Sequence, residues 1–355
     1  MDMTAIGLIE GLAETLAALS KSYFGAWSDQ LQRRKIFIVW GYTLSALSKP
    51  LMIVFPKFLW ILGMRITDRL GKGIRTAPRD ALLSDESEEK NKGKVFGFHK
   101  SMDSLGAALG PLLTLILLLL YHWTYEELFL MAFIPGIIAM VFAFLVQEKK
   151  RTVVHSHQKA VRLKDLFAYW KRARKDYRIV SVLLIIFYVF NSSDMLLLLK
   201  ARHHHMTDYQ VIVLYIVYNI SYALLALPFG IIGDRLGLRN TIAFGLFFFG
   251  LVYVGISLFN SWHELLFLFV CYGVYAAAIE GNIKALLSNL SSKGETATAI
   301  GLFTSLQGFT FVLSNTIAGW LWDTFNSSMP FMISGIVSFI ISVVLILYKP
   351  SNASI

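Results

Sequence analysis

Eleven apolar segments, each close to the length of a bilayer-spanning helix, take up most of this sequence. A helix needs about 20 residues to cross the hydrocarbon layer, and none of the segments shows the residue alternation of a barrel strand. Hydrophobic residues make up 56% of the chain, more than one water-soluble core could bury. We therefore predict an all-α integral membrane protein. The segments cover residues 5–27, 36–55, 58–78, 96–120, 128–146, 179–199, 209–229, 241–259, 264–283, 300–322 and 330–348.

One short motif occurs twice, each time where an apolar segment ends. Both copies read G-x-x-x-D, from Gly25 to Asp29 and again from Gly230 to Asp234. Six apolar segments separate the copies, so the sequence predicts two related halves with a repeat of six helices. Basic residues follow each copy, namely Arg33 and Arg34 after the first and Arg235 and Arg239 after the second.

The positions of the two copies predict a two-bundle architecture that lacks its first helix. Two apolar segments precede the motif in the second half, but only one precedes it in the first. We therefore expect 11 transmembrane helices of an original 12, with an incomplete amino terminus. The expected domains are a helical bundle over residues 1–146, a basic linker over 147–178 and a second bundle over 179–355.

The net charge of +10 is explained by membrane topology and not by nucleic-acid binding, because Lys and Arg gather in alternate loops between the apolar segments. The positive-inside rule places both motifs, the linker and the carboxyl terminus in the cytoplasm. The chain is therefore expected in the plasma or inner membrane. Its single cysteine, Cys271, excludes an intramolecular disulfide.

The linker contains a pattern typical of a surface helix. Leu163, Leu166, Phe167 and Trp170 share one helical face, and cations occupy the other positions. This pattern predicts an amphipathic helix on the inner leaflet. A solvated linker is the alternative.

Six plus six helices, a basic central linker and the repeated motif resemble the major facilitator superfamily of secondary transporters over essentially the whole chain. The stretch Gly106-Ala-Ala-Leu-Gly110-Pro111 is similar to the G-x-x-x-G-P motif of its drug and metabolite antiporter branch. The resemblance implies that Asp29 and Asp234, with their basic neighbours, form latches that break and re-form as the halves rock. A tight turn with an aspartate cap is the alternative role.

Charged residues inside the apolar segments are candidates for the transport path, because a charge at the bilayer centre costs at least about 2.5 kcal/mol unless it is paired or wetted. Arg65, Asp68 and Arg69 share one helical face. A carboxyl removed from water favours its protonated form, so Asp194 or Glu280, with Glu14, is expected to carry a coupling proton. Interhelical hydrogen bonds and ion pairs are the alternative roles. The candidates are Glu14, Arg65, Asp68, Arg69, Asp103, Asp194 and Glu280.

Several other functions find no support in the sequence. No nucleotide-binding loop, nucleophile elbow or zinc-protease motif occurs, so neither an enzyme nor a primary pump is expected. His203, His204 and His205 are adjacent on a short loop, and three adjacent side chains rarely converge on one ion. We expect no metal and no other cofactor.

The sequence therefore favours a monomeric secondary transporter that works by alternating access. Its expected partners are the lipid bilayer, a small organic solute and protons, with proton-coupled efflux as the reaction. A receptor or scaffold that moves no solute, or an inactive truncated transporter, is one alternative. An uncoupled facilitator or lipid flippase is another.

Overall fold

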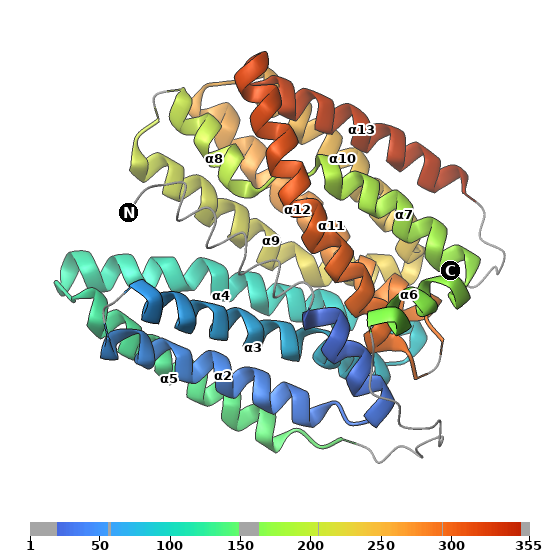
Figure 1. Cartoon of the computed structure of the whole chain (residues 1–355). Coiled ribbons are helices and arrows are strands. Elements are labelled where there is room, and N and C mark those ends of the chain that lie inside the picture. The colour runs from blue at the N-terminus through green and yellow to red at the C-terminus, as the bar shows by residue number, and fades with distance from the viewer. Residues whose placement is uncertain (1–19, 56–57, 149–162, 205, 293, 349–355) are drawn as a thin grey trace. The chain divides into compact units, whose positions relative to one another are not determined.

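The computed structural model describes residues 20–55, 58–148, 163–204, 206–292 and 294–348. All regular structure in these residues is helical. A helical segment over residues 20–31 comes first. It is followed by α2 (Lys35–Val54), α3 (Phe58–Asp85), the short η1 (Glu89–Asn91), α4 (Lys92–Leu120), α5 (Tyr125–Leu145), α6 (Leu163–Arg172), α7 (Lys175–Phe190), α8 (Asp194–His203), α9 (Asp208–Leu236), α10 (Leu238–Leu258), α11 (Trp262–Leu290), α12 (Thr296–Thr324) and α13 (Met329–Leu347) (Figure 1).

Nine stretches of the described residues are helical, long and apolar enough to cross a membrane. One of them, Lys175–His203, contains both α7 and α8. α3 is not among the nine, because charged residues such as Arg65 and Asp68 lower its apolarity. The predicted segment 5–27 lies largely outside the described residues. The all-helical membrane fold is confirmed, whereas the number of eleven spans stays a prediction.

The chain folds into two compact units. Of the described residues, unit 1 contains those in Met1–Asp85, Thr114–Ala173 and Ser291–Phe309, and unit 2 contains those in Glu86–Leu113, Arg174–Leu290 and Thr310–Ile355. Each unit combines segments from both halves of the sequence. The division into bundles over residues 1–146 and 179–355 stays a prediction.

In unit 1, α2 packs against both α3 and α5 (Figure 1). A Cβ atom on Gly41 would lie 2.6 Å from the carbonyl oxygen of Gly71, so only a residue without a side chain permits this approach. Arg75 of α3 donates a hydrogen bond of 2.8 Å to the Ser45 hydroxyl and lies 4.3 Å from the ring centroid of Tyr42. Close packing and a cation–π contact together hold α2 on α3.

In unit 2, α10 and α13 lie side by side (Figure 1). The hydroxyls of Ser338 and Ser342 on α13 donate to backbone carbonyls of α10 at 2.6 and 2.7 Å. A Cβ atom on Gly250 would lie 2.7 Å from the ring of Phe339. Small and hydroxylated residues at a helix contact are the usual means of association inside a bilayer.

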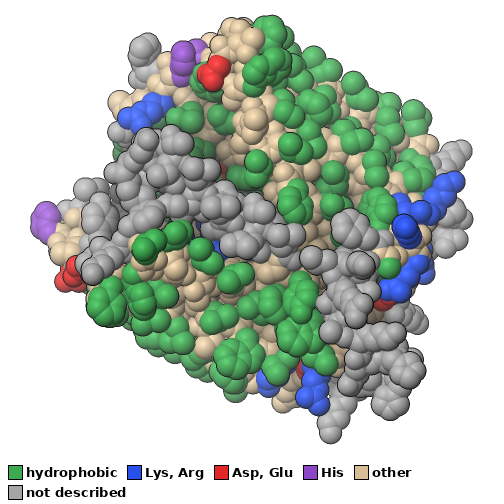
Figure 2. Space-filling view, in the orientation of Figure 1, with side chains coloured by type: hydrophobic (Ala, Val, Ile, Leu, Met, Phe, Trp, Pro, Cys, Tyr) green, Lys and Arg blue, Asp and Glu red, His purple; other side chains and the backbone are tan. Residues whose placement is uncertain are grey.

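Large hydrophobic side chains also cover the outside of the helices. Trp40, Leu224 and Ile340 are 59%, 70% and 58% exposed. Figure 2 shows hydrophobic side chains spread along the visible helices, with most of the visible Lys and Arg near helix ends. Such a surface suits contact with lipid tails and not with water.

Replacing Gly250 by alanine is expected to destabilise the fold by about 1–3 kcal/mol, because the added methyl group would push against Phe339. The measurement is the midpoint of thermal unfolding in one detergent. Gly319→Ala is the matched control, since no described atom lies within 4 Å of a Cβ atom at that position. Equal midpoints for the two variants would contradict this packing.

Candidate functional site

The second copy of the repeated motif lies where α9 meets the first turn of α4. The Asp234 carboxylate accepts hydrogen bonds from the backbone N–H groups of Gly93 and Lys94, each at 2.7 Å. A Cβ atom on Gly230 would collide with the carbonyl oxygen of Gly93. Asp234 therefore caps the amino terminus of α4, where the helix dipole favours negative charge.

The first copy makes the same contact between the helical segment 20–31 and α12. Asp29 is 7% exposed and accepts hydrogen bonds of 2.6 Å from both the backbone N–H and the hydroxyl of Thr298. A Cβ atom on Gly25 would lie 2.6 Å from the carbonyl oxygen of Ala297. In each copy the glycine admits the partner helix and the aspartate caps it.

The two partner helices share a pattern that sequence analysis missed. The pattern is a series of small residues four positions apart, Gly93, Gly97 and Ser101 on α4 and Ala297, Gly301 and Ser305 on α12. A Cβ atom on Gly97 would lie 2.5 Å from the carbonyl oxygen of Ala226, and one on Gly301 would lie 2.7 Å from that of Lys21. Residues four apart share one helix face. Small residues four positions apart at the start of a helix could therefore have identified α4 and α12 as the helices that the two motifs contact.

Only some of the basic residues predicted for the latch contact its aspartates. Arg34 is 1% exposed and forms ion pairs with Asp29 and, at 3.5 Å, with Asp85. Arg33 is exposed. The Asp29 contact is therefore a buried ion pair joined to a helix cap, an arrangement in which each charge has a partner.

The basic residues of the second copy lie differently. Arg235 is exposed, and Arg239 donates a hydrogen bond to the carbonyl oxygen of Tyr348. The contacts described above for Asp234 are with backbone N–H groups of α4. The Asp234 contact therefore consists of charge-assisted backbone hydrogen bonds.

Polar residues interrupt the span that contains α7 and α8. α7 ends at Phe190 and α8 begins at Asp194, which is where the sequence places a run of polar residues. The Asn191 amide donates to the Tyr275 hydroxyl at 2.9 Å, and the Tyr272 hydroxyl donates to the Asp194 carboxylate at 2.8 Å. A broken helix at membrane depth is tolerated where protein or a polar cavity satisfies its free groups.

Glu280 of α11 lies between side chains of two other helices. The Lys100 ammonium of α4 is 3.4 Å from one oxygen of its carboxylate, and the Tyr188 hydroxyl of α7 donates to the other at 3.4 Å. Lys100 also lies 3.9 Å from the Asp103 carboxylate. One ammonium group is therefore shared by two carboxylates.

Six buried tyrosines from four helices accompany these carboxyls. The rings of Tyr218, Tyr272 and Tyr275 form a continuous series, with centroid distances of 4.8 and 5.1 Å. The tyrosines are Tyr188 on α7, Tyr218 and Tyr222 on α9, Tyr253 on α10, and Tyr272 and Tyr275 on α11. We call these six residues, with Lys100, Asp103, Asp194 and Glu280, the carboxyl–tyrosine cluster, and all of it belongs to unit 2.

Four predicted path residues are not part of the carboxyl–tyrosine cluster. Arg65, Asp68 and Arg69 are half-buried on α3 in unit 1. Glu14 lies outside the described residues. Their roles in a transport path stay predictions.

Among the residues that the structure describes, no neighbouring helix approaches the G-x-x-x-G-P stretch of α4 closely. No described atom lies within 4 Å of a Cβ atom at Gly106 or Gly110, which precede Pro111. Close approach on this helix occurs at Gly93 and Gly97, nearer its start. Glycine is common in transmembrane helices, so its spacing alone does not locate a contact.

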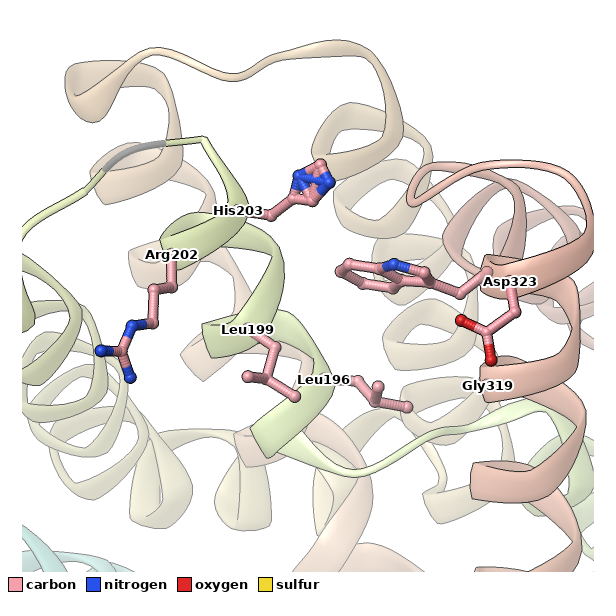
Figure 3. Close-up of a pocket in the computed structure, with 7 residues that line it drawn as sticks. Leu196, Leu199, Arg202, His203, Gly319 and Asp323 are labelled. Carbon is pink, nitrogen blue, oxygen red and sulfur yellow. The ribbon is translucent and has the colours of Figure 1, made fainter.

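A hollow of about 460 Å³ lies between α8 and α12 in unit 2 (Figure 3). Leu196, Leu199 and Trp322 give it apolar walls, and Figure 3 shows Arg202 and Asp323 on opposite sides. Two opposite charges among apolar residues do not select a class of ligand. The carboxyl–tyrosine cluster is therefore the stronger candidate for a transport site.

Asp234→Asn is expected to speed backbone hydrogen exchange at the start of α4 by about ten-fold or more, because the two charge-assisted bonds to Gly93 and Lys94 are weakened. The measurement is hydrogen exchange followed by mass spectrometry on peptides covering residues 92–97. Arg235→Gln, at the exposed neighbouring position, is the control and should leave the exchange unchanged. A similar effect of both changes would contradict the cap.

Comparison with known proteins agrees with this arrangement of helices. The family model described as Major Facilitator Superfamily matches residues 1–200 and 194–354. An uncharacterised MFS-type transporter of Methanocaldococcus jannaschii is 35% identical over 347 residues, which cover 97% of this chain and 85% of that protein.

Two solved structures share the fold. The human organic anion transporter MFSD10 has a TM-score of 0.85 at 16% identity, over 96% of this chain and 83% of that one. The E. coli transporter FucP in its outward conformation has a TM-score of 0.80 at 14% identity, over 99% and 91% of the two chains. With the family match over nearly its whole length, the chain belongs to the Major Facilitator Superfamily, a family of multi-pass membrane transporters.

Proposed function

We propose that this protein is a proton-coupled secondary transporter that exports a small organic solute by alternating access. Membership of the superfamily supports transport of a small molecule. Coupling to protons is supported by carboxyl groups within helices long and apolar enough to span the membrane. Carboxyls at such depth are costly and are typical of proton and substrate pathways.

The observation that carries the proposal is the position of Glu280. Its ion pair with Lys100 joins α11 to α4, which come from different halves of the sequence. Protonation of Glu280 removes that attraction, so the charge state of one carboxyl alters the contact between the two helices. Asp194 of α8 is the second candidate for proton binding. It accepts a hydrogen bond from Tyr272, which lies on α11 as Glu280 does.

The two aspartate caps are the proposed gates. By the positive-inside rule the repeated motifs and the carboxyl terminus are placed at the cytoplasmic face of the plasma or inner membrane. Breaking the caps of Asp29 and Asp234 would release the starts of α12 and α4 and open the cytoplasmic side. The monomer contains all of these parts, so no second copy is required.

Adding a transported solute to the purified protein is expected to release protons. The proton release should fall at least about ten-fold in Asp194→Asn or in Glu280→Gln, because an amide at either position cannot take up or lose the coupling proton. The measurement is the change of a pH indicator on addition of a panel of small organic solutes. Glu126→Gln, at an exposed position in the first turn of α5, is the control.

The outcomes separate the alternative functions. Full proton release by both the Asp194→Asn and the Glu280→Gln protein would contradict the assignment of proton binding to these two residues. Solute movement that does not respond to a collapsed pH gradient would indicate an uncoupled facilitator or lipid flippase. Folded protein that moves no solute would indicate a receptor, a scaffold or an inactive transporter.

A further inference from the structure

Glu148 caps the start of α2, as the motif aspartates cap the starts of other helices. Its carboxylate accepts hydrogen bonds from the backbone N–H groups of Arg34 and Lys35, the second at 3.1 Å. These groups lie at the start of α2, where backbone N–H groups have no acceptor within the helix. Asp234 binds two consecutive N–H groups at the start of α4 in the same way.

The start of α2 depends on a carboxylate from another part of the chain. α2 has no side-chain cap of its own and no acidic residue in its first turn. The cations Arg33, Arg34 and Lys35 occupy this place instead, although the helix dipole disfavours positive charge there. Glu148 lies three residues beyond the end of α5, which packs beside α2 (Figure 1). It therefore brings negative charge to a helix start whose first turn supplies none.

The backbone that Glu148 binds carries the cation that faces Asp29. The Arg34 side chain is 1% exposed, pairs with Asp29 and donates to the Ser28 hydroxyl at 2.9 Å. Asp29 in turn accepts from Thr298 of α12, and all of these residues belong to unit 1. A buried guanidinium with partners on several sides loses some of them when its backbone shifts. Glu148 therefore sets the position of the guanidinium that Asp29 meets.

The second half of the sequence joins the corresponding places. Arg239 follows Asp234 by five residues, as Arg34 follows Asp29. Arg239 donates a hydrogen bond to the carbonyl oxygen of Tyr348, the residue after α13. In each half, the arginine position after the motif is thus bound to the chain just beyond a later helix, α5 or α13. The contact recurs with different chemical groups, which indicates that joining these two places matters more than any one bond.

Glu148 also lies at the start of the basic linker. The sequence continues with the cations Lys149, Lys150 and Arg151, and the linker extends to residue 178. The carboxylate therefore connects the chain segment between the two halves with the Asp29 contact of the first half. A displacement of the linker start would withdraw the acceptor from α2 and free the backbone of Arg34.

We propose that Glu148 is a positioning residue for the gate at Asp29: by holding the backbone of Arg34, it keeps the guanidinium on Asp29 and the start of α12 capped. This inference rests on the gates of the proposed transport function and adds the residue through which the linker acts on one of them. Release of Glu148 loosens the starts of α2 and α12 together. Movement of the linker is thereby coupled to opening of the cytoplasmic side.

The test is hydrogen exchange followed by mass spectrometry on the full-length protein in lipid nanodiscs. Glu148→Gln should speed exchange about ten-fold or more in residues 35–39, because an uncharged amide oxygen replaces a charged acceptor of two bonds. It should also speed exchange about three-fold or more in residues 298–302, where Asp29 makes the cap. The matched control is Glu126→Gln, the same chemical change at an exposed position of α5.

A second variant separates the two steps. Arg34→Lys keeps the backbone N–H that donates to Glu148, but loses the planar fork that pairs with Asp29. It should speed exchange in residues 298–302 and leave residues 35–39 unchanged. Glu148→Gln added to Arg34→Lys should then change only residues 35–39, because both substitutions act on α12 through the same side chain. Thermal unfolding of each variant checks that the protein is folded.

Three outcomes would overturn the inference. Faster exchange confined to residues 35–39 in Glu148→Gln would mean that this carboxylate caps α2 and does nothing more. A further increase at residues 298–302 in the double variant, or an equal effect of Glu126→Gln, would also contradict it. The exchange is measured without a solute, so the positioning role and the transport function can fail separately. Unsubstituted protein that moves no solute would contradict transport and leave the contact of Glu148 in place.

Discussion

Two aspartates cap the amino-terminal ends of two helices, and the helix packing within each unit depends on these caps. Asp234 accepts from the backbone N–H groups of Gly93 and Lys94 in the first turn of α4, and Asp29 accepts from Thr298 in the first turn of α12. The first N–H groups of a helix have no partner within the helix itself, so the carboxylates supply the acceptors that these groups would otherwise lack. Gly25 and Gly230 make the caps possible, because any side chain there would hold the helices apart. Charge and close packing therefore act together.

Two of the ion pairs among the described residues differ in how far they are buried. Arg34 is almost fully buried between Asp29 and Asp85, so its charges are fixed and breaking the network is costly. Glu280 and Lys100 are partly exposed, with 27% and 19% of their side-chain surface accessible. The buried network of Arg34, Asp29 and Asp85 suits a contact that stabilises one conformation of the protein. The accessible pair suits a site that changes its charge.

Features that depend on local sequence could be predicted, and those that depend on distant contacts could not. The spans follow from apolar length, and the break between α7 and α8 follows from the polar run ending at Asp194. The helix that each motif aspartate caps lies more than a hundred residues away in sequence, as does the Lys100 partner of Glu280. The six tyrosines come from four helices, so no local pattern brings them together. For Gly106 and Gly110, whose spacing matches a motif of close helix packing, the described residues contain no neighbour within 4 Å of an added Cβ atom.

The central claim is that the cap of Asp234 breaks and re-forms as the transporter changes state. The most direct measurement is the distribution of distances between spin labels at the exposed positions Lys90 on η1 and Asn240 on α10, with Cys271 replaced by alanine and the protein in lipid nanodiscs. The account predicts two distance populations, with the longer one enriched in Asp234→Asn. A single population that is unchanged by this substitution would contradict it.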